Sequence, residues 1–159
     1  MTGIQCLITP AWTPDVAHTL HPLDDEAAFA ASFALMQQLR PHLSCPERYV
    51  AQLTRQTQQG YRLLGARDAE RIVGLAGYRL QENLIYGRFV YIDDLVVTPD
   101  LQRSGLGAQL LDTVRAEALR LGCDHLVLDT GLHNALAQRF YFRCGLLSRG
   151  IHFCEDLRP

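Results

Sequence analysis

The segment YIDDLVVTPDLQRSGLGA, residues 91–108, joins two different hydrophobic patterns. Its first part ends at Val97 and is rich in the β-branched and apolar residues that favour strands. Beyond its glycines the pattern becomes helical, with apolar residues at Leu106, Leu110, Leu111, Val114, Ala118 and Leu121. We therefore predict a strand, a glycine-rich turn and a helix, an arrangement that directs the start of the helix towards a ligand.

The turn itself, Gln102–Ala108, carries the strongest chemical signal. Gly105 and Gly107 allow backbone N–H groups to approach an anion closely, and the start of a helix adds an effective charge of roughly +0.5. A dinucleotide-binding turn would require Gly or Ala where Leu110 stands, and a P-loop would require a lysine. Two interpretations remain: a tight turn with no ligand, and a pyrophosphate-binding turn of another kind.

Hydrophobic periodicity and turn residues predict the other elements. In the N-terminal part we expect a strand at Gln5–Thr9 within a Pro-containing, loose stretch, Met1–Pro22, and helices at Asp24–Arg40 and from a capping box at Ser44–Glu47 to Gly60. We then expect strands at Tyr61–Ala66, Arg71–Leu80 and Tyr86–Val97, a turn at Gln81–Asn83, a helix at Gly105–Leu121, a strand at His125–Asp129, a helix at Asn134–Cys144 and a closing strand at Ile151–Leu157.

This order of elements, βααβββαβαβ, predicts an α+β fold. Three consecutive hairpin-linked strands form an antiparallel meander, whereas the strand–helix–strand unit that follows makes two strands parallel. We therefore expect a mixed, mostly antiparallel sheet with helices on both faces, in a single domain that covers residues 1–159.

The composition is that of one compact soluble domain. Of the 159 residues, 48% are hydrophobic and 20% are charged, and the formal net charge is −2. No window approaches the ~18 to 20 consecutive apolar residues of a membrane helix, and the N-terminus lacks a basic stretch followed by an apolar run. The five cysteines are scattered and form no CxxC pair, so we interpret them as reduced thiols. We expect a cytoplasmic protein with no membrane partner.

The basic residues exclude several functions. All fifteen are arginines, which excludes Schiff-base and pyridoxal phosphate chemistry on a lysine. A slightly acidic chain is also a poor candidate for sequence-independent nucleic-acid binding, so we expect no nucleic-acid partner. His125, His133 and His152 lack the spacing of metal ligands, and we expect no metal site.

Two motifs resemble those of the GNAT superfamily of N-acetyltransferases. The first is Gln102-x-x-Gly105-x-Gly107 after the strand Tyr91–Pro99, which looks like the superfamily's Q/R-x-x-G-x-G/A signature. The second is Asn134-x-x-Ala137-x-x-x-Tyr141-x-x-x-Gly145-Leu146, which resembles a block that usually ends in Phe where this chain has Leu146. Both motifs occur in the superfamily's order and on the expected elements.

The resemblance implies a site for acetyl-CoA as co-substrate. Superfamily members hold it where two parallel strands splay, which here would be between Leu95–Val97 and His125–Asp129. Backbone groups of Leu95, Val96 and Val97 would pair with the pantetheine arm as an added half-strand. The pyrophosphate would be held by the backbone amides of Arg103, Ser104, Gly105, Leu106, Gly107 and Ala108. Asn134 would contact the cofactor from the next helix, and the alternative is that it is an ordinary N-cap. Arg103 could add its side-chain charge to a phosphate, and the alternative is that this side chain is merely solvated.

Tyr141 is implied as the catalytic acid. The CoA thiolate that leaves when an amine attacks the thioester needs a proton, and a phenol with a pKa of ~10 can donate it. Without the flanking motif, a core tyrosine beside Phe140 and Phe142 would be the better interpretation. Cys144 lies one turn further along the helix and is interpreted as a packed thiol.

Asp93 is the candidate base. Its spacing to Gln102 matches the place of the superfamily's carboxylate, while Asp94 should point to the opposite face of the strand. A β-bulge would exchange the roles of these two residues. An aspartate pKa near ~4 lies about six units below that of an alkylamine. Either the pocket lowers the pKa of the amine, or Asp93 mainly orders water and attracts the cation.

The function that the resemblance implies is acetyl transfer to a primary amine by direct attack in a ternary complex. The acceptor stays open between a small metabolite, a polyamine, an antibiotic and a protein amino group. The alternatives are a catalytically silent acyl-CoA-binding domain and a structural domain without a cofactor. Tyr141 argues against the first, and the two motifs together argue against the second. A homodimer is common in the superfamily, but the sequence selects no interface.

Overall fold

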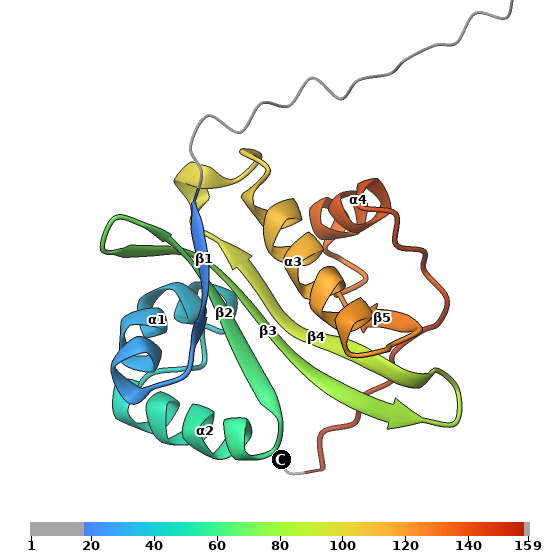
Figure 1. Cartoon of the computed structure of the whole chain (residues 1–159), viewed down its shortest axis with the longest axis horizontal. Helices are drawn as coiled ribbons and strands as arrows, with labels where there is room; N and C mark the ends of the chain where they lie inside the picture. Colours follow the sequence, from blue (N-terminus) through green and yellow to red (C-terminus); the bar gives the residue numbers. More distant parts are fainter. Residues whose placement is uncertain (1–17, 158–159) are drawn as a thin grey trace, which may run out of the picture.

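The computed structural model describes residues 18–157 and contains one five-stranded sheet with helices on both faces (Figure 1). The elements are β1 (Thr19–Leu23), α1 (Glu26–Leu39), α2 (Pro46–Gln58), β2 (Tyr61–Asp68), β3 (Arg71–Asn83), β4 (Gly87–Val97), a 3-10 turn at Pro99–Leu101, α3 (Leu106–Arg120), β5 (His125–Leu128) and α4 (Ala135–Arg143). None of the helices in this part of the chain has both the length and the apolar character needed to cross a membrane.

The strands lie in the sheet in the order in which they occur in the chain. β1 to β4 are antiparallel to their neighbours, and β5 is parallel to β4 because α3 returns the chain to the same end of the sheet. The predicted α+β class, with a mixed and mostly antiparallel sheet, is confirmed.

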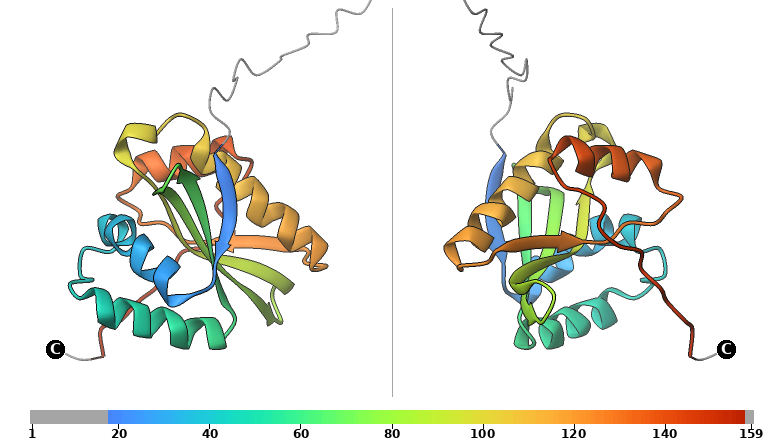
Figure 2. Two further views of the ribbon diagram at one scale, coloured as in Figure 1. Left: turned by 60° about the vertical axis from the view of Figure 1, so that its left-hand side comes forward. Right: turned by 90° about the vertical axis from the view of Figure 1, so that its right-hand side faces the viewer.

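The sheet separates two hydrophobic cores (Figure 2). On one face α3 packs through Leu106, Leu110, Leu111, Val114 and Ala118. On the other face α1 and α2 pack through Phe29, Leu35, Met36, Tyr49 and Leu53. These residues recur at helical spacing, so each helix docks on the sheet through one apolar face.

The parallel pair β4–β5 is short and opens towards the carboxyl ends of its strands. Phe89–Ile92 pair with His125–Leu128, and β5 ends there. β4 continues to Val97 and pairs over this last stretch with β3. Within residues 18–157, the edge of β4 after Ile92 therefore has no strand beside it on the β5 side. The opening lies beyond the end of β5 rather than along it.

The N-terminal boundary and one turn differ from the predictions. β1 occupies Thr19–Leu23, inside the stretch that was expected to be loose, and it tolerates Pro22 because it is an edge strand. The strand predicted at Gln5–Thr9 lies outside the described residues. β3 continues through Asn83, so the turn predicted at Gln81–Asn83 falls instead on residues 84–86.

The predicted capping box of α2 is wrong. The helix begins at Pro46 with Cys45 as its N-cap, one residue later than Ser44, and no side chain caps it. Proline at the first helical position lacks an N–H group that would need an acceptor, and its fixed φ angle suits the start of a helix, so it favours a start at this residue. Glu47 instead accepts a hydrogen bond from Cys45 Sγ at 3.1 Å.

The closing strand predicted at Ile151–Leu157 is also wrong. This segment has no strand partner, and the side chains of Phe153 and Leu157 are 88% and 87% exposed. Alternating apolar residues form a strand only where a neighbouring edge accepts their backbone hydrogen bonds, and the segment does not lie along such an edge of its own chain.

Candidate functional site

The glycine turn presents the start of α3 beyond the end of β4. Arg103 and Gly105 have left-handed φ angles of +68° and +93°, and Gly105 is the N-cap of the helix. Glycine adopts this backbone without strain. The first amides of a helix have no acceptor inside it, so those of Gly107 and Ala108 face outwards from the N-terminus. Ser104 closes the turn, since its hydroxyl donates to Leu101 O at 2.7 Å.

Leu95, Val96 and Val97 form the part of β4 whose edge is open. Leu95 and Val97 pack against the α3 core, and Val96 packs against the core under α1 and α2. Their side chains thus fix the strand from both faces and leave its backbone edge as the available surface. Gln102 Nε2 donates to Val97 O at 3.4 Å, which ties the glycine motif to the end of the strand.

The structure brings the two sequence motifs together. A β-carbon built on Gly107 would lie 3.4 Å from Phe140 Cζ and 3.8 Å from Val97 Cγ2, so the start of α3 packs closely against α4 and β4. Arg115 of α3 also donates to the carbonyl oxygen of Cys144, at 3.0 Å, at the end of α4. Tyr141 is the next residue along α4, and its ring centroid lies 5.2 Å from that of Phe140, which faces the glycine turn.

Tyr141 is a half-buried phenol. Burial, and to a lesser extent Cys144 nearby, raises the pKa of Tyr141 above its usual value. The side chain therefore keeps its proton at neutral pH and can act as a donor. Cys144 packs against the α3 core, and burial raises the pKa of its thiol as well, which suits a packed thiol rather than a nucleophile. Leu146 packs against the same core.

Asn134 is the N-cap of α4. Its Oδ1 atom accepts a hydrogen bond from Ala137 N at 3.1 Å, as expected from the capping interpretation. This hydrogen bond holds the Asn134 side chain at the N-terminus of α4. A contact between Asn134 and the cofactor stays a prediction.

A β-bulge changes the orientation of the two carboxylates of β4. Gly77 of β3 pairs with Asp94 and Tyr78 pairs with Ile92, so Asp93 is the extra residue. Asp93 and Asp94 consequently both line a hollow on the face of the sheet that α1 and α2 cover. The prediction that Asp94 points to the opposite face is wrong, because the bulge interrupts the alternation of side chains.

Asp94 anchors two elements to the bulge. Its Oδ1 accepts from Arg40 Nε at 2.9 Å, and its Oδ2 accepts from the Tyr61 hydroxyl, also at 2.9 Å. Arg40 Nη2 donates in addition to the backbone oxygen of Asp93 at 2.8 Å. Burial and the adjacent Asp94 raise the pKa of Tyr61 well above its usual value, so the phenol stays a donor. The end of α1 and the start of β2 are thereby fastened to β4.

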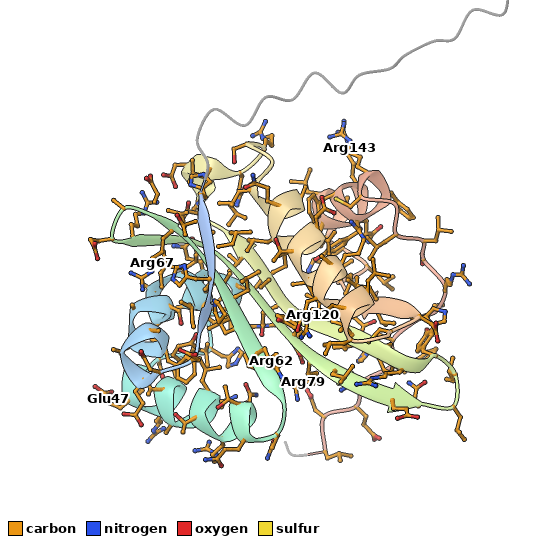
Figure 3. The ribbon with its side chains drawn as sticks, viewed as in Figure 1. Glu47, Arg62, Arg67, Arg79, Arg120 and Arg143 are labelled. Carbon is orange, nitrogen blue, oxygen red and sulfur yellow. The ribbon has the colours of Figure 1, made fainter. Side chains whose placement is uncertain are left out.

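Asp93 has a different environment. Its Oδ2 accepts from Arg79 Nε at 2.9 Å, and both side chains keep about a quarter of their surface exposed, 25% and 23%. Burial raises the pKa of Asp93, while Arg79 opposes the increase. Arg79, which comes from β3 (Figure 3), also lies over the ring of Tyr61 at 5.4 Å. Asp93 is thus the carboxylate of the two that can reach a bound molecule.

The hollow beside these residues has a volume of about 330 Å³, the size of a small-molecule site. Its polar lining consists of Arg40, His42, Tyr49, Gln52, Gln56, Tyr61, Arg79, Tyr91, Asp93 and Asp94. Burial raises the pKa of Tyr49 to about 12. The Tyr91 hydroxyl donates to Asp129, just past the end of β5. A larger hollow, about 780 Å³, lies between α3 and strands β1 and β2 and contains none of the predicted site residues.

Arg40, Tyr61, Arg79 and Tyr91 were not among the predicted site residues. They belong to a helix end and three different strands, and no local motif marks them. Only a prediction of strand register could have placed them beside Asp93 and Asp94. In the described part of the chain, no group of three or more His, Cys, Asp or Glu side chains is placed to hold a metal ion.

Comparison with known proteins agrees with the two motifs. The sequence model of the acetyltransferase (GNAT) family matches residues 25–146. An aminoalkylphosphonate N-acetyltransferase from Salmonella typhimurium is 32% identical over 95 residues, which are 59% of this chain and 61% of that protein. The match thus spans less than two thirds of the relative's length.

Solved structures share the fold at low sequence identity. A transcriptional regulator from Bacillus halodurans superposes with a TM-score of 0.78 at 20% identity, over 89% of this chain and 100% of the other. Glucosamine-6-phosphate N-acetyltransferase from Arabidopsis thaliana superposes with a TM-score of 0.73 at 17% identity, over 90% and 100%. The fold and the arrangement of the two motifs define an acyltransferase-type domain. The chain belongs to the GNAT acetyltransferase family.

The bulge and its anchor depend on Gly77. A β-carbon built there would lie 1.8 Å from the Tyr61 hydroxyl oxygen, so Gly77→Ala must displace the ring and break its bond to Asp94. We expect the substitution to lower the free energy of unfolding by about 1–3 kcal/mol, measured by chemical denaturation. Gly150→Ala, where no atom lies within 4 Å of the added carbon, is the control and should have little effect.

A double-mutant cycle tests the stated cause. Tyr61→Phe removes the nearest clashing atom and the hydrogen bond to Asp94, but leaves ring carbon Cζ at 2.5 Å from the added carbon. Combining it with Gly77→Ala should therefore cost less than the sum of the two single changes, without abolishing the cost. Simple additivity would mean that the Tyr61 hydroxyl is not what the new methyl group displaces.

Proposed function

We propose that this protein is an acetyl-CoA-dependent N-acetyltransferase that transfers an acetyl group to the primary amine of a small molecule in a ternary complex. The observation that carries the proposal is the open edge of β4 beyond Ile92. The glycine turn and Tyr141 lie on its α3 side, and the hollow with Asp93 lies on its α1–α2 side. The two substrates can meet at this edge from opposite faces of the sheet.

The cofactor side suits acetyl-CoA. The free backbone edge at Leu95–Val97 offers hydrogen-bonding groups to the amides of a pantetheine arm, as in β-augmentation. The amides at the start of α3 and the left-handed turn at Arg103 and Gly105 suit the pyrophosphate, because the helix N-terminus favours negative charge. Arg103 would add its charge there, and Asn134 would contact the cofactor from the start of α4.

The reaction needs proton transfers at two atoms, the amine nitrogen and the leaving sulfur. One proton of the ammonium first leaves through water ordered by Asp93. The amine nitrogen then forms a bond to the thioester carbon, and the carbon–sulfur bond breaks to release the CoA thiolate. Tyr141 donates its proton to that sulfur, which suits a phenol that burial keeps protonated. The second proton that the nitrogen loses as the amide forms restores the phenol. A carboxylate that titrates several units below an amine serves better to position this water and attract the cation than to deprotonate the amine directly.

Asp93 is preferred over Asp94 for this role. Both oxygens of Asp94 accept hydrogen bonds from Arg40 and Tyr61, and its side chain is 13% exposed. Asp93 is bonded through Oδ2 to Arg79, which leaves Oδ1 for water or the substrate amine. Asp94 then acts as a structural anchor for the bulge.

The acceptor hollow favours an amine that carries its own anionic group. Arg40 and Arg79 line it together with Asp93 and Asp94, so the charges of the empty hollow balance. A molecule with an ammonium beside Asp93 and an anion beside the terminal nitrogens of Arg79 preserves that balance, whereas a polyamine does not. The name of the Salmonella typhimurium relative, an aminoalkylphosphonate N-acetyltransferase, describes such a molecule.

A catalytically silent acyl-CoA-binding domain is the alternative. It would keep the glycine turn and the open strand edge but would not need a protonated phenol on α4 or a carboxylate in a separate hollow. Binding of acetyl-CoA without release of its thiol, over a broad range of amines, would favour this alternative.

Tyr141→Phe should separate chemistry from binding. We expect kcat to fall by about 10²- to 10⁴-fold, because the proton donor for the thiolate is lost. The affinity for acetyl-CoA, measured by calorimetric titration, should stay near that of the unmodified protein. Tyr78→Phe removes another half-buried phenol whose pKa burial raises, on β3, and should leave kcat unchanged. Equal losses in both variants would contradict a specific role for Tyr141.

Arg79→Gln should change the choice of acceptor. With thiol release as the readout, KM should rise about tenfold or more for amines that bear a carboxylate or phosphonate on a neighbouring carbon, because an ion pair is lost. Simple alkylamines should change much less. Arg120→Gln, at the exposed end of α3 (Figure 3), is the control. A rise of the same size for every amine would reject the anion-binding role of Arg79.

Arg79→Gln should also shift the pH dependence. Activity requires ionised Asp93, so kcat/KM falls as the pH is lowered through the pKa of that carboxyl. Arg79 opposes the increase that burial causes in this pKa, and its removal should raise the pKa further. The acid limb of the kcat/KM profile should therefore move to higher pH. If the acid limb of the kcat/KM profile does not move, the limb reports the ionisation of a group other than Asp93.

A further inference from the structure

Tyr91 lines the acceptor hollow and has no part in the reaction as described so far. Its half-buried side chain comes from β4, two residues before Asp93, and both residues line the same hollow. Burial and the hydrogen bond to Asp129 raise the pKa of Tyr91, and the nearby charge of Asp93 adds to the increase. The phenol therefore lies beside the carboxylate that is proposed to attract the substrate ammonium.

Asp129 fixes the direction of the Tyr91 hydroxyl. The hydroxyl donates its hydrogen bond to Asp129 Oδ2. Asp129 follows the last residue of β5, and Ile92 and Leu128 are the last pair between β4 and β5. The bond thus joins the two strands at the point where they separate. His152 Nδ1 lies 3.0 Å from the same oxygen of Asp129, so the carboxyl group has a second partner that holds it in place.

This bond determines what Tyr91 can offer to a molecule in the hollow. A phenol has one proton to donate, and here that proton is directed to Asp129. Within residues 18–157, no group is placed to donate to the phenol oxygen. Towards the hollow, Tyr91 is consequently a hydrogen-bond acceptor only.

The hollow then contains two acceptors for one nitrogen. Asp93 is bonded to Arg79 through Oδ2, which leaves Oδ1 as one acceptor, and the Tyr91 oxygen is the other. Once the ammonium has lost a proton, a primary amine has two N–H groups and one lone pair. Two acceptors can hold the two N–H groups and leave the lone pair to attack the thioester carbon. A secondary amine has one N–H group and leaves one acceptor unpaired, which is costly in a partly buried place.

We propose that Tyr91 selects primary over secondary amines by accepting a hydrogen bond from the acceptor nitrogen. Asp129 is its positioning residue, because it takes the only proton of the phenol and keeps the oxygen available as an acceptor. This inference rests on the proposed function, since it requires the acceptor amine to bind in the hollow.

The test compares kcat/KM for a primary amine with kcat/KM for its N-methyl derivative, with thiol release as the readout. Suitable probes are aminomethylphosphonate, glycine and propylamine, each with its N-methyl derivative. The unmodified protein should prefer the primary amines, and Tyr91→Phe should lower this preference by about tenfold, because only the primary amine loses a hydrogen bond. Tyr86→Phe removes a phenol that does not line the hollow and should keep the preference. The affinity for acetyl-CoA should not change in either variant.

Variants of Asp129 test the positioning role. In Asp129→Ala the phenol proton is released and can point into the hollow, so the preference for primary amines should fall although Tyr91 is still present. Asp129→Asn keeps a side-chain oxygen that can accept from the phenol and should retain most of the preference. Asp124→Ala, at the other end of β5, is the matched control and should have no effect. An unchanged preference in Asp129→Ala would reject the role of Asp129.

The outcomes separate this inference from the proposed function. If Tyr91→Phe lowers kcat/KM equally for a primary amine and its N-methyl derivative, or lowers neither, Tyr91 does not select between them and the inference is wrong. The same holds if the unmodified protein shows no preference. If the unmodified protein releases thiol with none of the amines while circular dichroism shows that it is folded, the proposed function fails, and this inference fails with it.

Discussion

The bulge at Asp93 in β4 is the constraint on which both halves of the site depend. One extra residue turns Asp93 and Asp94 to the same face of the sheet, whereas a regular strand would separate them. The bulge is held by Asp94, which binds the end of α1 through Arg40 and the start of β2 through Tyr61. The same place marks the end of pairing with β5, so the carboxylates stand where β4 becomes an open edge. The arrangement of the hollow follows from this local irregularity, and the open edge of β4 begins next to it.

The two carboxylates show how neighbouring identical side chains acquire different roles. Both carboxylate oxygens of Asp94 accept hydrogen bonds, one from Arg40 and one from Tyr61, and its side chain is mostly buried, so its role is structural. Asp93 shares one oxygen with Arg79 and stays accessible from the hollow. Burial raises its pKa while Arg79 opposes the rise, so the arginine favours the ionised form of a carboxylate in a partly desolvated place. Environment, not residue type, separates the anchor from the candidate base.

Most of the fold was predictable because its signals are local. The helical periods of α1 and α3, the glycines that end α2, α3 and α4, and the strand pattern up to Val97 each involve residues a few positions apart. Errors arose where a distant partner decides the outcome. β1 formed as an edge strand despite Pro22, and residues 151–157 found no edge of their own chain. The failed cap at Ser44 is a local exception, because α2 begins at Pro46 with Cys45 as its N-cap. The predicted faces of Asp93 and Asp94 failed because a bulge is a property of two paired strands.

By itself, the sequence determined the order of elements from α1 to α4, the glycine turn at the start of α3 and the tyrosine on α4, and so the resemblance to the family. These features depend on turn residues and hydrophobic spacing within short segments. Only the tertiary structure decided that Arg40, Tyr61 and Arg79 surround the two carboxylates, across separations of 14 to 54 residues. It also decided that the opening begins beyond β5 and that residues 151–157 form no strand along β5. The physical reason is that strand register and edge pairing arise from contacts between segments, which no single segment encodes.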